Sequence, residues 1–199
     1  MKQAKTWGSA LLFFLVMTLL CGVLYTAVCT GIAQLFFPHQ ANGSIIEVDG
    51  TKYGSELLGQ SYSEPDHMWG RLTNANASTF TDDNGNPVMW YGPSNLSPAS
   101  EEFEAIVQER VDQIRDAHHD QGGKPIPSDL VTCSGSGLDP HISPAAADYQ
   151  VERLAKNTGK SESDVRAIIK QCTEQPQLGI LGDARVNVLK VNLMLDGIL

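Results

Sequence analysis

The sequence has no Asp, Glu, Lys or Arg between Lys5 and Glu47, and residues 7–37 are rich in Leu, Phe, Val and Ala. A helix that crosses a membrane needs about 20 mostly apolar residues, so this run is long enough. The apolar region of a cleaved signal peptide is normally only about 7 to 15 residues and ends in small residues, which is not the pattern here. We therefore predict a retained transmembrane helix over residues 9–37, preceded by a tail of residues 1–8.

Basic residues flank only one end of this predicted helix. Lys2 and Lys5 precede it, whereas Glu47 and Asp49 follow it before the first basic residue, Lys52. Because positively charged flanks stay in the cytoplasm, the N-terminus should be cytoplasmic. We expect a single-pass protein of the cell (inner) membrane, in contact with the lipid bilayer, with residues 38–199 forming one extracytoplasmic domain.

The chain beyond the helix is poor in positive charge. It contains all 23 Asp and Glu but only 12 of the 14 Lys and Arg, which gives a formal charge of −11. Nucleic-acid phosphates require a basic surface, so this composition excludes a nucleic-acid partner. It also disfavours adhesion to anionic lipid headgroups.

Several chemical motifs are missing. The pattern C-x-x-C is absent and the histidines show no ligand spacing with the cysteines, so we predict no metal site. Cys133 and Cys172 can pair in an oxidising compartment or remain two buried free thiols, and both alternatives stay open. Gly159-Lys160-Ser161 ends like a phosphate-binding loop, but Leu154 stands where that loop needs its first glycine. We interpret Gly159 as a helix end and Ser161 as the cap of the next helix.

The rest of the pattern indicates an α+β domain. Alternating residues around the turn Asp49-Gly50 predict a hairpin, and residues 61–98 form a long loop-rich stretch. Three helices should follow: one capped by Ser97 with Pro98 in its first position, one over residues 144–157, and one from Ser161 to about residue 173. The final segment "ARVNVLKVNLMLD" suggests a strand that shares a sheet with the hairpin.

The stretch "VTCSGSGLDPHISPAAADYQ", residues 131–150, holds the main candidates for chemistry. Ser136, Asp139 and His141 could serve an anchored serine hydrolase, but the elbow G-x-S-x-G is absent and three neighbours in one turn rarely form a triad. Gly135 and Gly137 tolerate positive φ, so with the free amides of the following helix they could bind an anion or a carboxylate. The alternative is a rigid strand-to-helix turn without a ligand.

Small residues also recur within the apolar helix, and such a face lets a second helix approach closely. The alternative is the ordinary use of small residues in spanning helices. The residues are Gly22, Thr26, Ala27, Thr30 and Gly31.

With its anchor, the chain resembles the C subunits of the bacterial Kdp-type potassium-transporting ATPase over nearly its whole length. The segments that carry the resemblance are "QANGSIIEVDGTKYGSELLGQSY", "GRLTNANAST", "PSNLSP", "IPSDLVTCSGSGLDPHISPAAADYQVERLA" and "RVNVLKVNLMLD", and "SGSGLDPHISPAAA" is the most specific. Within residues 61–98 the chain departs from the family at "HMWGRLT" and "NPVMWYGPSNLSP", which affects contacts assigned to that stretch.

The resemblance implies an accessory subunit with no catalytic site or cofactor of its own. Its partners would be a channel-like potassium-binding subunit and a pump subunit that hydrolyses ATP with magnesium. The family is described as a catalytic chaperone that raises the ATP affinity of the pump subunit, whereas the charge flanks favour a domain that stabilises the channel subunit from outside. A direct ATP role would use Ser134, Gly135, Ser136, Gly137 and Gln150 as nucleotide contacts.

Overall fold

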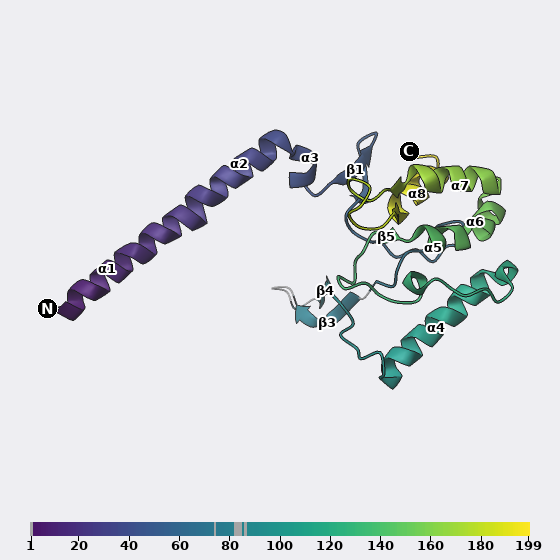
Figure 1. Cartoon of the computed structure of the whole chain (residues 1–199), viewed down its shortest axis with the longest axis horizontal. Helices are drawn as coiled ribbons and strands as arrows, with labels where there is room; N and C mark the ends of the chain where they lie inside the picture. The colour runs from purple at the N-terminus through teal and green to yellow at the C-terminus, as the bar shows by residue number, and fades with distance from the viewer. Residues whose placement is uncertain (1, 74, 82–84, 86) are drawn as a thin grey trace. The chain divides into compact units, whose positions relative to one another are not determined.

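The computed structural model describes residues 2–73, 75–81, 85 and 87–199, and the chain divides into two compact units, residues 1–45 and 46–199 (Figure 1). The first unit is a long helix built from α1 (Lys2–Met17), the π-helical segment η1 (Thr18–Tyr25) and α2 (Thr26–Phe36). Over Lys5–Phe36 it is long and apolar enough to cross a membrane. The sequence-based expectation of such a helix is confirmed in length and composition.

The π-helical segment interrupts the hydrogen-bond register in the middle of this helix. Thr26 Oγ1 donates to the carbonyl of Cys21 at 3.3 Å, a bond that spans five residues. Of the small residues in the helix, Gly22 lies in this π-helical segment, whereas Ala27 and Gly31 lie in α2. A short helix α3 (Pro38–Ala41) follows.

The β-structure of the second unit is divided among three small sheets. The predicted hairpin is present as β1 (Ile45–Val48) and β2 (Thr51–Ser55), with positive φ at Asp49 and Gly50 in the turn. A second antiparallel pair, β3 (Ala75–Thr81) and β4 (Pro87–Tyr91), lies inside the stretch that the sequence suggested was loop-rich. That prediction underrated the Thr, Phe, Val, Trp and Tyr residues that favour strands.

Capping side chains set the helix starts. Helix α4 (Glu101–Ala117) begins after Ser100, whose Oγ accepts from the amide of Phe103 at 3.2 Å. The predicted start at Ser97-Pro98 is therefore three residues early, because those residues form a turn closed by a bond from the Ser100 amide to the Ser97 carbonyl. Helix α7 (Glu162–Gln171) is capped by Ser161 as predicted.

The predicted helix over residues 144–157 is two helices, α5 (Pro144–Tyr149) and α6 (Val151–Thr158), which are separated at Gln150. As predicted, α6 ends at Gly159, which takes a left-handed conformation with φ +71°. Two 3₁₀ turns, η2 (His119–Gln121) and η3 (Ser128–Leu130), lie between α4 and α5.

The prediction of a terminal strand is wrong beyond its first residues. Only β7 (Arg185–Asn187) is a strand, and α8 (Val188–Leu195) follows at once. Asn187 causes the change, because its Oδ1 accepts from the amide of Lys190 at 3.0 Å and caps the helix. The central strand β7 pairs with β5 (His141–Ile142) and β6 (Thr173–Glu174), so the predicted sheet shared with the hairpin is also wrong.

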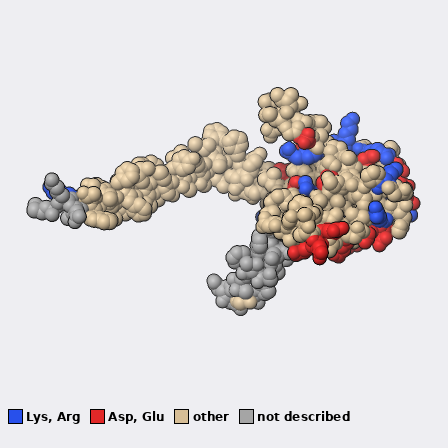
Figure 2. Space-filling view, turned by 60° about the horizontal axis from the view of Figure 1, so that its bottom comes forward, with Lys and Arg blue, Asp and Glu red and all other residues tan. Residues whose placement is uncertain are grey.

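The core lies among α5, α6, α7, α8 and the sheet around β7, with α4 running beside them (Figure 1). Burial of these apolar side chains is the main stabilising contribution to the fold. On the outside, acidic side chains gather along the lower edge of the face in Figure 2. The fully buried apolar side chains include Met68, Ile114, Leu130, Leu154, Val165, Val186 and Val191.

Candidate functional site

The candidate turn is closed by its own side chains and backbone. Ser134 Oγ and Ser136 Oγ lie 3.1 Å apart, and Ser136 Oγ also accepts from the amide of Leu138 at 3.2 Å. The amide of Gly137 donates to the carbonyl of Ser134 at 3.1 Å. Ser134 is buried, whereas Gly135 and Ser136 are exposed at the surface.

The two glycines of the turn have different roles. Gly137 has φ +69°, and a Cβ there would collide with the backbone carbonyl of Gly92, so only glycine fits. Gly135 has no atom within 4 Å of an added Cβ. Gly137 is therefore required by a close approach of two chain segments.

Asp139 and His141 form a pair that does not include Ser136. Asp139 Oδ1 accepts from the amide of His141 at 3.0 Å and lies 3.5 Å from His141 Nδ1. The other ring nitrogen, Nε2, lies 3.9 Å from Glu174 Oε1. The hydrogen bond from His141, opposed by partial burial, holds the pKa of Asp139 below its ordinary value, and Arg71 at 3.7 Å adds to the effect.

A hydrolase would need the imidazole within hydrogen-bond reach of the nucleophilic hydroxyl. In the described part of the chain, both ring nitrogens of His141 face carboxylates, and the Ser136 hydroxyl is engaged within the turn. The structure thus brings Asp139 and His141 together but leaves Ser136 outside the pair.

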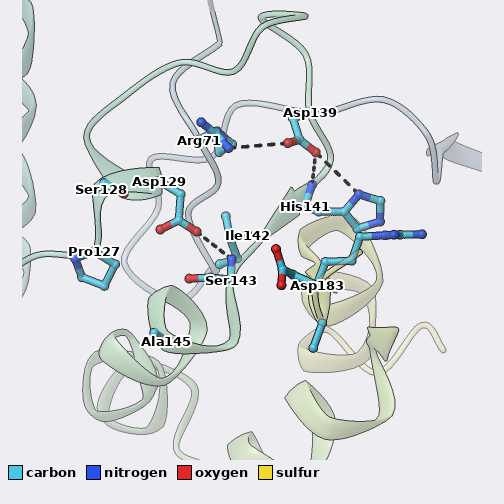
Figure 3. Close-up of a pocket in the computed structure, with 12 residues that line it drawn as sticks. Arg71, Pro127, Ser128, Asp129, Asp139, His141, Ile142, Ser143, Ala145 and Asp183 are labelled. Carbon is cyan, nitrogen blue, oxygen red and sulfur yellow. Dashed lines mark hydrogen bonds and ion pairs between the residues drawn. The ribbon is translucent and has the colours of Figure 1, made fainter. Parts of the chain in front are cut away.

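Beside this pair lies an open cleft of about 640 Å³ (Figure 3). Arg71, Asp139 and His141 lie along one part of its wall, and the carboxylate of Asp183 points into the space between the walls. Apolar side chains line the cleft together with charged ones of both signs, which suits contact with polar groups of another molecule.

The start of α5 borders the same cleft, and two of the amides there are already bonded. Ser143 caps the helix by accepting from the amide of Ala146 at 3.1 Å. Asp129 Oδ2 accepts from the amide of Ser143 at 2.6 Å (Figure 3). A carboxylate of the same chain thus takes the place where an anion would meet this helix end.

Gln150, the remaining sequence-predicted contact, lies in the core. Its Oε1 accepts from the amide of Trp69 at 2.8 Å and from Arg153 at 2.7 Å. Its Nε2 donates to the carbonyls of Trp69 and Ala146 at 3.0 and 3.2 Å. The side chain is fully buried, so the structure uses it to hold the segment around Trp69 rather than to line the turn at residues 134–137.

Arg153 is the main polar residue that sequence reasoning missed. It is only 5% exposed, and its guanidinium lies 4.7 Å from the centre of the Trp69 ring. It also donates to His118 Nε2 at 2.9 Å, while His118 Nδ1 donates to the carbonyl of Ile114. Burial, reinforced by the nearby arginines, lowers the pKa of His118 to about 4, so the ring stays neutral. Nothing in the spacing of α6 distinguishes this arginine from a surface one.

The cysteines of the second unit are free thiols, which decides between the two alternatives left open by the sequence. Cys133 is partly exposed, and Cys172 is buried with its sulfur 3.4 Å from Met194 Sδ. Burial raises the pKa of the Cys172 thiol to about 11, so it is unreactive at neutral pH.

Comparison with known proteins covers nearly the whole chain. The family model described as "K+-transporting ATPase, c chain" matches residues 7–197. A potassium-transporting ATPase KdpC subunit of Clostridium botulinum (strain Eklund 17B / Type B) is 57% identical, with all of both chains covered. The KdpC subunits of Clostridium perfringens and Sorangium cellulosum are 56% and 46% identical, covering 98% and 94% of this chain and 98% and 95% of theirs. The chain therefore belongs to the KdpC family, the c chains of the K+-transporting ATPase.

Proposed function

We propose that the chain is a non-catalytic accessory subunit of an ATP-driven potassium uptake complex, anchored by the helix Lys5–Phe36. The observation that carries this proposal is full-length membership of the KdpC family together with one apolar N-terminal helix. Potassium binding and ATP hydrolysis then belong to the channel-like and pump subunits.

The second unit acts, in this proposal, outside the cytoplasm and steadies the outer mouth of the channel-like subunit. The flanking charges support this side, because Lys2 and Lys5 precede the helix and acidic residues follow it. The engaged hydroxyls of the turn and the buried amide of Gln150 also support docking rather than nucleotide binding. The competing role, in which the unit contacts ATP directly and so raises the ATP affinity of the pump subunit, requires this unit in the cytoplasm.

Protease treatment of intact spheroplasts tests the side directly. We expect the second unit to be cut while a cytoplasmic marker protein stays intact, and lysis should not increase the cut fraction. If the unit is protected until the spheroplasts are lysed, it lies on the ATP side and the proposed role is refuted.

The small-residue face of the helix is proposed to dock on helices of the partner subunits. Apart from adjacent residues and the backbone of the helix itself, no described atom lies within 4 Å of a Cβ added at Gly22 or Gly31, so leucine at both positions makes the helix bulkier without a clash. We expect Gly22→Leu/Gly31→Leu to lower co-purification of the partner subunits several-fold. Gly8→Leu, at the N-terminal end of the helix and 14 residues before Gly22, is the matched control and should not change recovery. Equal recovery of all variants would remove docking from this face.

A further inference from the structure

The loop between β6 and β7 carries three large apolar side chains in water. Leu178, Ile180 and Leu181 are 88%, 81% and 57% exposed, and we call them the apolar tip. Single exposed apolar residues are ordinary on protein surfaces, but several grouped on one loop indicate a surface that another apolar phase covers.

The loop is held in a defined conformation rather than left free. Gln177 and Leu181 exchange two backbone hydrogen bonds of 3.0 and 2.9 Å. At its base Glu174 pairs with Arg185 in the sheet, and their side chains form an ion pair of 2.7 Å. Leu178 has φ +55°, a conformation that bulky residues seldom adopt. The fold therefore holds these apolar side chains outward.

The backbone of the loop is suited to leave water. The amides of Gly179, Ile180 and Leu181 donate to carbonyls of Pro176 and Gln177 within the loop. Pro176 has no amide hydrogen to satisfy. Because an unsatisfied backbone group is costly in an apolar phase, this internal bonding removes part of the penalty of burying the tip there.

The loop is rooted where the chain from the apolar helix enters the second unit. The chain enters at Ile46 in β1, which pairs with β2, and the carbonyl of Glu56 just after β2 accepts from Asn187 Nδ2 at 2.8 Å. Glu56 also forms an ion pair with Lys190. Residues 37–45 connect the helix to this point and span at most about 30 Å when fully extended, which limits how far Ile46 can lie from the end of the helix.

We propose that the apolar tip inserts into the interfacial region of the same bilayer that the chain's own helix crosses. The membrane is favoured as the occupant because the short connecting segment leaves the root of the loop within reach of it and because the tip needs only an apolar phase. The inference goes beyond the accessory role proposed above. It requires a membrane-anchored chain but holds on either side of the membrane.

The charges around the tip predict how this contact responds to salt. The chain has no Lys or Arg between Lys170 and Arg185, and Glu174 is neutralised by Arg185. Insertion must therefore come from apolar burial and not from attraction to anionic headgroups. We expect it in zwitterionic vesicles and expect high salt to leave it unchanged.

The test places a tryptophan at the tip of the full-length chain. Ile180→Trp is reconstituted in phosphatidylcholine vesicles with brominated acyl chains, and the emission of the wild-type chain is subtracted. We expect the added fluorescence to be quenched at least about twofold, in low and high salt alike. The matched control is Ile106→Trp on α4, a residue that is 42% exposed, and its added fluorescence should not be quenched.

A second variant links the quenching to the neighbouring side chains. Adding Leu178→Ser and Leu181→Ser to Ile180→Trp should abolish the quenching while the near-ultraviolet circular dichroism of the folded unit is retained.

Three results would overturn the proposal. One is quenching at residue 180 no greater than at residue 106, and another is quenching that needs anionic lipid and disappears in salt. The third is a tryptophan at residue 180 whose fluorescence is shielded from acrylamide in the assembled complex but not in vesicles. That result would show that a partner protein covers the apolar tip. None of these results affects the protease test, so the proposed accessory role is tested independently of membrane insertion.

Discussion

Replacing Arg153 with methionine tests whether this buried cation holds the second unit together. The guanidinium donates to the carbonyls of Pro65 and His67 at 2.5 and 2.9 Å, and to Gln150 Oε1 and His118 Nε2 at 2.7 and 2.9 Å. Burial lowers the pKa of Arg153 to about 10, which still leaves it charged at neutral pH. The arginine thus joins α6 to the segment before Trp69 and to the end of α4.

Methionine keeps most of the side-chain length but donates no hydrogen bond. Hydrogen bonds to a charged group contribute about 1.5 to 3 kcal/mol each, and a buried acceptor left unsatisfied costs about 1 to 3 kcal/mol, so losing these bonds together should cost about 3 to 5 kcal/mol. We expect Arg153→Met to lower the free energy of unfolding by about that total. Arg153→Lys keeps the charge but not the planar fork, so it should lose less.

The assay is urea unfolding of the full-length chain in detergent micelles, followed by near-ultraviolet circular dichroism. The matched control is Arg166→Met, which removes an arginine that is half exposed and paired with Glu162 and Asp148. Exposed ion pairs contribute only about 0 to 1 kcal/mol, so this variant should be nearly as stable as the wild type. Equal losses in the two variants would refute the structural role assigned to Arg153.

Two further predictions concern pH and the candidate turn. The folded state holds His118 neutral with a pKa of about 4, so the unfolded chain binds the proton first as the pH falls. As the pH falls from 6.5 to 4, His118 should lower the free energy of unfolding by up to about 3 kcal/mol, and it should contribute no further loss below pH 4. In urea unfolding, the free energy of unfolding of His118→Gln should change less steeply with pH over this range than that of the wild type. Gly137→Val should sharply lower the yield of folded protein because of the close approach of Gly92, whereas Gly135→Val should be recovered normally. Equal recovery of the two glycine variants would contradict the packing argument.

Local signals predicted part of the fold well. The turn Asp49-Gly50 and the cap at Ser161 were identified correctly, because each depends on the chemistry of a few adjacent residues. The C-terminal segment was misread because its buried residues suit either a strand or a buried helix. The cap supplied by Asn187 decides between them. Val188, Val191 and Leu195 are all buried at helical spacing, a pattern that becomes visible once the helix start is known.

The buried polar network could not be predicted in the same way. Its members lie on separate segments that meet only after folding, and Arg153 reaches back more than eighty positions to the carbonyls before Trp69. The family resemblance had instead suggested Gln150 as a contact for a nucleotide, together with residues 134–137. In the structure Gln150 lies at the break between α5 and α6, and its side chain is fully buried.

The block with the most specific family resemblance gains a physical explanation from these contacts. Ser134 and Ser136 close the turn, Gly137 admits the approach of Gly92, and Ser143 caps α5. Asp139 meanwhile fixes the backbone of His141 at the edge of the sheet. A motif whose polar groups are used within the chain builds a shape rather than a reaction centre. That shape suits the accessory role proposed above.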